Sequence, residues 1–386
     1  MARAYRPPLY VTRSQGSRKW LVDGRELVDY TMGHGALLLG HAHPSLVRAV
    51  QEQVSRGTHY GAGHPLEVEW AERIRQLVPS IEETRFTASG TEAAMLAMRV
   101  ARVATGRDRV VKLFEHFHGW SDLLNLDLGI DGVAHPAAGI PAAVTELTSV
   151  VHPDPEAIRE ALAGRDAAAV ILEATGAHYG RIALDAAVVR AIREACTDTG
   201  TLLVFDEVVS GFRVAPGGMQ SLMGVTPDLT VLGKVMCGGL PGGAVGGRRE
   251  LMELLATTIS HPGTWNANPL SAAAGIATLE VVADGAPQRA ADDYAALLAA
   301  GWTEELEAAG IPGAVRRLSS IIHVQLDDGD AQSQLSNRMR THNVDLLHTS
   351  AFCSSVHTEE DLQLSVDAFR EAIRSPALQA ATTRSG

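Results

Sequence analysis

The segment LLVFDEVVSGFR (202–213) decides the fold. It opens with a continuous apolar run, which is typical of a strand buried on both faces of a parallel sheet. The run ends in two carboxylates, Asp206 and Glu207. In open α/β sheets ligands bind at the carboxyl ends of strands, so Asp206 could serve a metal, a sugar hydroxyl or a protonated ring nitrogen. The alternative is that Asp206 has only a structural role and caps a turn. This segment alone leaves both interpretations open.

Strand-like runs alternate with helix-like stretches on both sides of this segment. The expected strands are TRFTAS, RVVKLF, ELTSVV, AAAVIL, TLLVFD and LTVLG. Such alternation predicts an α/β domain with a mostly parallel sheet covered on both faces, followed by a smaller α+β domain. We expect an N-terminal segment at 1–48 that packs with the small domain, a large domain at 49–284 and the small domain at 285–386.

Composition narrows the class of protein. The 386 residues are 46% hydrophobic and 20% charged, with a net charge of −12. An acidic chain has no general attraction for phosphate backbones or anionic membranes, so we expect no nucleic-acid or membrane partner. Three cysteines without a CxxC pair favour a reducing compartment. The segment MARAYRPPLY shows no secretory signal, and we expect a cytoplasmic protein.

A second apolar strand, LTVLGK (229–234), ends in a lysine beside the glycine-rich stretch VMCGGLPGGAVGG. Lysines normally lie on solvated faces. Partial burial would lower the pKa of Lys234 below the reference value of about 10.4, and a neutral amine is a nucleophile toward aldehydes. An ATP-type phosphate loop is disfavoured, because Lys234 precedes the glycines and GxxxxGK[ST] is absent.

Two further motifs follow strand-like runs. Ser89-Gly90-Thr91 starts a long helix, whose free N–H groups and two hydroxyls can form a phosphate cup. The alternative is that Ser89 or Thr91 is simply an N-cap. Phe117, in FEHFHGW (114–120), can stack on a flat ring, although an isolated aromatic is more often part of a core.

The four motifs SGT, FHG, DE and GK occur in this order, each at the expected end of a strand. Together with the stretches LGHAHP, FTASGTEA, FDEVVSGFR and GTWNANPLSAAAGIATLE, they resemble the class III aminotransferases. The resemblance is strongest to the branch that contains glutamate-1-semialdehyde 2,1-aminomutase and β-amino-acid aminotransferases. It covers nearly the whole chain from about residue 9. It implies a fold-type I transferase that depends on pyridoxal 5′-phosphate (PLP).

The resemblance also implies roles for individual residues. Lys234 would form the Schiff base with PLP and shuttle a proton, while Asp206 would keep the pyridine nitrogen protonated. The other cofactor contacts would be Ser89, Gly90, Thr91, Phe117, His118 and Val208. Thr264, in GTWNANP, matches a threonine that reaches the phosphate of the partner subunit's site. This implies a homodimer with shared active sites.

Some positions depart from the family pattern. Glu173-Ala174 stands where relatives commonly have Glu-Pro, and Phe117 where they usually have Tyr. His178 replaces an Asn or Ala that lies near the cofactor's phenolic oxygen, and His34 stands at a substrate-side position that is often aromatic. We therefore take His34 and His178 as candidates for the substrate pocket.

For the reaction, the resemblance favours an aminotransferase that acts on a small amino donor and a keto or aldehyde acceptor. The alternative is an intramolecular aminomutase of the glutamate-1-semialdehyde type, gated by the loop at 121–141, or another PLP-dependent isomerase or racemase. The segment that carries substrate-carboxylate contacts in aminomutases is reduced here to MARAYRPPLY, which favours the aminotransferase. The histidines of GHAHP (40–44) match a structural loop of the family, so we expect no metal.

Overall fold

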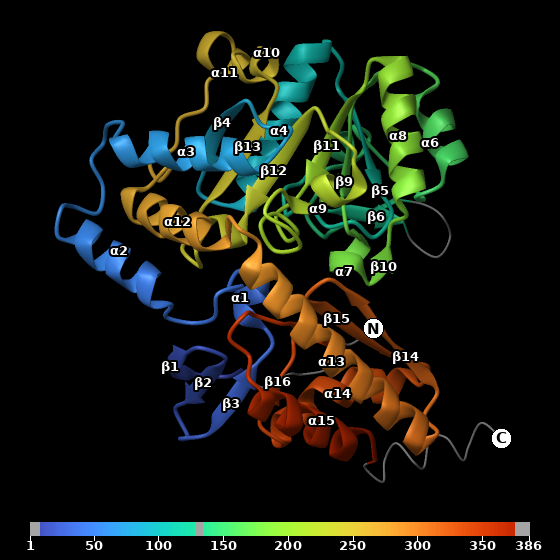
Figure 1. Ribbon diagram of the computed structural model, residues 1–386. Helices are drawn as coiled ribbons and strands as arrows, with labels where there is room; N and C mark the ends of the chain where they lie inside the picture. Colours follow the sequence, from blue (N-terminus) through green and yellow to red (C-terminus); the bar gives the residue numbers. More distant parts are fainter. Residues whose placement is uncertain (1–7, 129–133, 375–386) are drawn as a thin grey trace. The chain divides into compact units, whose positions relative to one another are not determined.

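The computed structural model describes residues 8–128 and 134–374 (Figure 1). The first seven residues of MARAYRPPLY and residues 129–133 of the predicted gating loop lie outside the described residues. The chain divides into two compact units. The larger unit spans residues 48–284, and the smaller unit combines residues 1–47 with 285–386.

The larger unit is built on a seven-stranded sheet in the order β4-β13-β12-β11-β9-β5-β8 (Figure 1). Its strands are β4 (Glu83–Thr87), β13 (Gly243–Gly247), β12 (Leu229–Gly233), β11 (Leu202–Asp206), β9 (Ala167–Glu173), β5 (Arg109–Leu113) and β8 (Thr148–Val151). Within this sheet β13 alone runs antiparallel to the rest. The mostly parallel sheet that the sequence predicted is confirmed.

Helices pack on both faces of this sheet. Successive residues of β11 point to opposite faces, so Val204 packs in the apolar cluster that contains α4, whereas Leu203 and Phe205 pack in the cluster that contains α6 and α8. This two-sided burial explains why the strands are continuous apolar runs in the sequence. The helices within this unit are α3 (Pro65–Leu77), α4 (Gly90–Thr105), α5 (Ala142–Thr145), α6 (Pro155–Leu162), α7 (Ala177–Gly180), α8 (Ala186–Thr199), α9 (Gly218–Met223), α10 (Arg249–Met252), α11 (Leu254–Thr257) and α12 (Pro269–Val282). The division between the two units falls within α2 (Pro44–Val54). Shorter elements are β6 (Leu126–Leu128), β7 (Ala134–Pro136), β10 (Ile182–Ala183) and the 3₁₀ turn η1 (Lys234–Cys237).

The glycine-rich stretch after Lys234 contains strand β13, which the sequence did not predict. This strand lies between β4 and β12, and its five residues are buried. A Cβ atom on Gly243 would lie 2.3 Å from the carbonyl oxygen of Ser89, and one on Gly246 would lie 2.8 Å from the Ile81 side chain. The glycines therefore permit close approach of neighbouring elements rather than a loop.

The smaller unit contains two sheets, with strand orders β1-β2-β3-β16 and β14-β15-β17. Trp302, stacked on Phe369 at 5.1 Å between ring centroids, lies in its buried apolar cluster. Its elements are β1 (Val11–Gln15), β2 (Arg18–Leu21), β3 (Glu26–Asp29), α1 (Met32–Gly35), α13 (Ala286–Ala309), β14 (Gly313–Leu318), β15 (Ile321–Leu326), α14 (Gly329–Thr341), β16 (Val344–Asp345), β17 (Ser350–Phe352) and α15 (Glu359–Arg374). Among all helices in the described part of the chain, none has the length and apolar character needed to cross a membrane.

Candidate active site

Asp206 and Lys234 lie at the carboxyl ends of two neighbouring parallel strands. Asp206 is the last residue of β11 and pairs in register with Val231 of β12, and Lys234 comes three residues later. Burial lowers the pKa of Lys234, and the nearby carboxylates of Asp206 and Glu173 partly oppose this effect. The lysine is thus deprotonated more readily than an exposed one, as a nucleophilic amine requires.

The backbone of Lys234 is strained. Its φ angle is +48°, in the left-handed region that residues with a Cβ rarely adopt, and it begins the single turn η1 directly after Gly233. Such a conformation costs about 1–3 kcal/mol and persists where surrounding structure enforces it, often at functional sites. The Nζ atom of Lys234 lies 5.7 Å from the centre of the Tyr179 ring.

The Asp206 carboxylate is buried and held on both oxygens. Oδ1 accepts the backbone N–H of Val208 at 3.0 Å, and Oδ2 accepts Nδ1–H of His118 at 2.8 Å. His118 is itself only 1% exposed. Its ring therefore contacts the carboxylate and orients it, which links the loop after β5 to the end of β11.

The ends of β5 and β9 are tied together by reciprocal hydrogen bonds. The backbone N–H of Glu173 donates to Nδ1 of His116 at 2.8 Å, and the backbone N–H of Phe117 donates to Oε1 of Glu173 at 2.8 Å. The second carboxyl oxygen, Oε2, accepts the backbone N–H of Tyr179 at 3.2 Å. One buried glutamate thus fixes two loop segments beside the candidate lysine.

Burial controls the protonation of Glu173 and His116. It raises the pKa of Glu173 to about 8, and the charge of Asp206 adds to the increase. Burial also lowers the pKa of His116 to about 2, so His116 stays neutral and remains an acceptor. Glu173 consequently changes charge near neutral pH, where most carboxyl groups are already ionised.

The SGT motif forms the start of α4. Ser89 is the N-cap, and its hydroxyl accepts the backbone N–H of Glu92 at 3.2 Å, while the Glu92 carboxylate accepts the N–H of Ala88 at 2.8 Å. The first bond shows the N-cap role of Ser89 directly, and the second ties the residue before the N-cap to the first turn of the helix. The N–H groups at the start of a helix can bind an anion such as a phosphate group.

Three motifs that are distant in sequence meet at this helix start. A Cβ atom on Gly90 would lie 2.9 Å from Cγ2 of Val208. A Cβ atom on Gly119, whose φ is +88°, would lie 2.4 Å from Oγ1 of Thr91. The SGT, FHG and DEV segments are therefore packed against one another, and glycine is needed at both contacts.

These residues fit the cofactor that the sequence resemblance implies. A phosphate-bearing pyridine aldehyde needs a reactive amine, a carboxylate for its ring nitrogen, an anion site and a surface for its ring. Lys234, Asp206 and the start of α4 supply the first three. Phe117, in the loop after β5, keeps 53% of its surface exposed and offers the fourth.

Two residues were predicted for the substrate pocket. The side chain of His178 is 40% exposed, and its Nε2 atom lies 3.6 Å from Oε2 of Glu115. His34 belongs to the smaller unit and is exposed in a left-handed turn. Their roles in a substrate pocket stay predictions.

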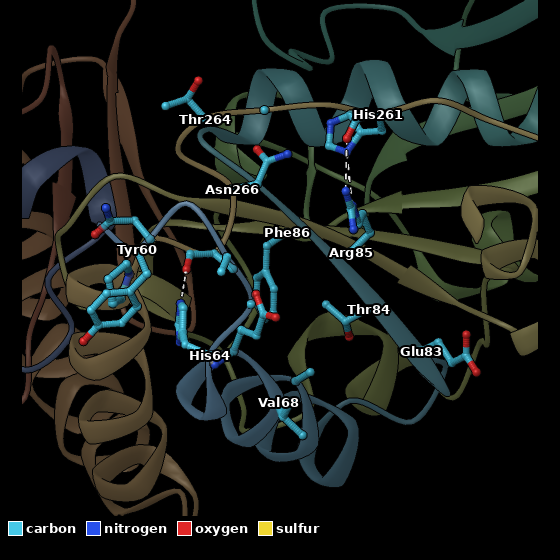
Figure 2. Close-up of a pocket in the computed structure, with 18 of the residues that line it drawn as sticks. Tyr60, His64, Val68, Glu83, Thr84, Arg85, Phe86, His261, Thr264 and Asn266 are labelled. Carbon is cyan, nitrogen blue, oxygen red and sulfur yellow. Dashed lines mark hydrogen bonds between the residues drawn. The ribbon is translucent and has the colours of Figure 1, made fainter. Parts of the chain in front are cut away.

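Thr264 lines a separate open cavity of about 1040 Å³ in the larger unit (Figure 2). It is exposed, and its carbonyl oxygen accepts Nε2–H of His59 at 2.5 Å. Figure 2 also shows Arg85 directed at His261, where the guanidinium donates to the His261 carbonyl at 3.0 Å. The predicted contact of Thr264 with a partner subunit stays a prediction.

Sequence reasoning missed the positions of Glu173 and Tyr179. Glu173 attracted notice only because proline does not follow it. Tyr179 reaches the site through a turn in which non-glycine residues adopt positive φ angles, +52° at His178 and +63° at Tyr179. Nothing in the residue types signals such a turn.

Comparison with known proteins gives a consistent result. The family model "Aminotransferase class-III" matches residues 1–373. A glutamate-1-semialdehyde 2,1-aminomutase of Methanopyrus kandleri is 39% identical over 390 residues, which cover 95% of this chain and 91% of that protein. One from Thermus thermophilus is 38% identical over 391 residues, covering 95% and 91%.

Solved structures agree with the family match. An omega-transaminase from Sphaerobacter thermophilus superposes with a TM-score of 0.91 and 31% identity, covering 97% of this chain and 92% of that one. A glutamate-1-semialdehyde aminomutase from Pseudomonas aeruginosa has a TM-score of 0.88 and 25% identity, covering 95% and 87%. Aminomutases and a transaminase thus both occur among the relatives.

Proposed function

Because this chain belongs to the class III aminotransferase family, we propose that it is an aminomutase that moves an amino group within a small amino-aldehyde related to glutamate 1-semialdehyde. Dependence on PLP follows from the family. The observation that carries the PLP chemistry of this proposal is the placement of Asp206 and a readily deprotonated Lys234 at the ends of adjacent parallel strands. The names of the curated relatives favour the mutase over the aminotransferase that we expected from the sequence.

Each residue has a defined task in this proposal. When bound, PLP supplies an aldehyde for an amine and a ring that withdraws electrons from the adjacent carbon. Lys234 holds the cofactor and then, as a free amine, accepts and returns a proton at the substrate carbon. Asp206, oriented by His118, holds the ring nitrogen in its protonated form. The start of α4 binds the phosphate, and Phe117 covers one face of the ring.

A second candidate function is amino transfer between separate donor and acceptor molecules. The close structural match to an omega-transaminase favours it. The same residues serve both reactions. The two functions differ in whether the amino group returns to the molecule that supplied it or is passed to another one.

The decisive experiment supplies the holoenzyme with glutamate 1-semialdehyde and no keto acid. The mutase proposal predicts an isomer in which nitrogen has moved from C2 to C1, detected by NMR, at a rate that added keto acid does not raise. Lys234→Ala should lower this rate by roughly 10²–10⁴-fold. Product that appears only when a keto acid is present would instead establish the aminotransferase.

We also propose that the protein works as a homodimer with shared sites. Thr264 lies next to exposed aromatic side chains, with Trp265 60% and Tyr60 44% exposed. Aromatic residues are enriched in protein interfaces, which supports burial of this region by a second copy. The sequence resemblance gives Thr264 its expected task there, which is to reach the phosphate in the partner's site.

A further inference from the structure

Tyr179 is the one aromatic side chain that the structure describes in a ring contact with the Lys234 amine. Its ring centre lies 5.7 Å from Nζ, and the residue is partly buried. We propose that Tyr179 is a positioning residue, whose ring face fixes where the Lys234 amine rests when that amine is free. This inference rests on the proposed function of Lys234.

The turn that carries Tyr179 is held in place from two sides. Gly176 and Ala177 bridge to β10, and a Cβ atom on Gly176 would lie 2.2 Å from the carbonyl oxygen of Ile182. On the other side, the N–H of Tyr179 is bound by the Glu173 carboxyl at 3.2 Å. Two consecutive left-handed residues, His178 and Tyr179, cost backbone energy that a loose loop would release. The surrounding contacts thus fix the backbone of the turn from which the Tyr179 ring projects.

The chemistry of the phenol suits a positioning role. Burial raises the pKa of Tyr179, and the Glu173 carboxyl adds to this, so the phenol stays neutral. A neutral ring attracts an ammonium through its negative face within about 6 Å. The charged groups that act on Lys234 are Asp206, Glu173 and Arg213. Tyr179 therefore adds a directional contact without adding a charge.

Competitive labelling of the apoprotein tests this idea without relying on turnover. A small amine-reactive reagent is applied across a range of pH, and modification of Lys234 is measured by mass spectrometry in wild type, Tyr179→Phe and Tyr179→Leu. Because the ring stabilises the ammonium, the labelling midpoint should lie about 0.4 pH unit lower in Tyr179→Leu than in wild type. Tyr179→Phe, which keeps the ring face, should match wild type.

The outcomes separate this inference from the proposed function. Borohydride reduction of each PLP-loaded protein first shows whether Lys234 carries the cofactor. An adduct in all three proteins with one shared labelling midpoint would overturn the role of Tyr179 and leave Lys234 untouched. No adduct in wild type would instead overturn the function. If Tyr179→Leu does not fold, Tyr179→Met fills the same space without an aromatic face and should give the same lower midpoint.

Discussion

At the scale of single residues, Glu173 makes stability depend on pH. Its folded pKa of about 8 lies above the ordinary value of 4.5, so folding favours the protonated form. This contribution is complete below about pH 4.5 and is lost as pH rises to 8, where the buried group ionises. Glu173→Gln cannot ionise. The variant should therefore gain stability relative to wild type between pH 5 and 8.5.

Urea unfolding at these two pH values measures the difference. Glu304→Gln, which removes an exposed carboxylate, is the matched control, and its effect should be the same at both pH values. If Glu173→Gln also behaved identically at pH 5 and 8.5, the raised pKa of Glu173 would be wrong.

Asp206 leads to a second residue-scale prediction. Asp206→Asn keeps the shape of the side chain but removes the charge that sustains a protonated ring nitrogen. Charged hydrogen bonds contribute about 1.5–3 kcal/mol, so we expect turnover to fall roughly 10- to 100-fold and PLP to leave faster on dialysis. Cofactor absorbance and kcat measure both effects. Asp198→Asn, on the exposed face of α8, is the control and should retain wild-type values.

At the scale of elements, the packing of the start of α4 requires that residue 90 have no side chain. Gly90→Ala would push a methyl group to 2.9 Å from Val208, whose branched side chain turns with difficulty. We expect a loss of about 1–3 kcal/mol in the free energy of unfolding and weaker PLP binding. Gly329, the first residue of α14, has open space around its Cβ position, so Gly329→Ala should change stability by less than about 1 kcal/mol. Equal effects of the two substitutions in thermal or urea unfolding would contradict the packing argument.

The elements also show which parts of the structure can be predicted from sequence patterns. Apolar runs located the strands that end near Asp206 and Lys234, because parallel strands buried on both faces leave an unmistakable pattern. The same logic failed for β13, since its glycines serve close packing rather than a turn. It failed again for Tyr179, which is placed by a left-handed turn and by a hydrogen bond from its backbone to Glu173. Contacts between segments distant in sequence decide both cases.

At the scale of the whole molecule, the larger unit preorganises its candidate site through links between strand ends. His116 and Glu173 connect β5 with β9, and His118 connects the loop after β5 with Asp206 at the end of β11. These bonds join backbone and side chains of the protein itself. The Asp206 carboxylate and the loop after β5 are therefore held in place by the fold itself, as an accurate catalytic site requires.

A homodimer with shared sites predicts that two variants, each defective in a different residue of the site, restore activity when they form a mixed dimer. If each site combines Lys234 of one subunit with Thr264 of its partner, then mixing Lys234→Ala protein with Thr264→Ala protein should restore activity. Random exchange makes half of the dimers mixed, and each mixed dimer has one site that lacks both defects. About a quarter of wild-type activity should therefore return, well above the mean of the two variants assayed separately. If mixed dimers, verified by mass spectrometry with two affinity tags, gained nothing, Lys234 and Thr264 of the same subunit would serve one site, which would contradict the shared-site proposal.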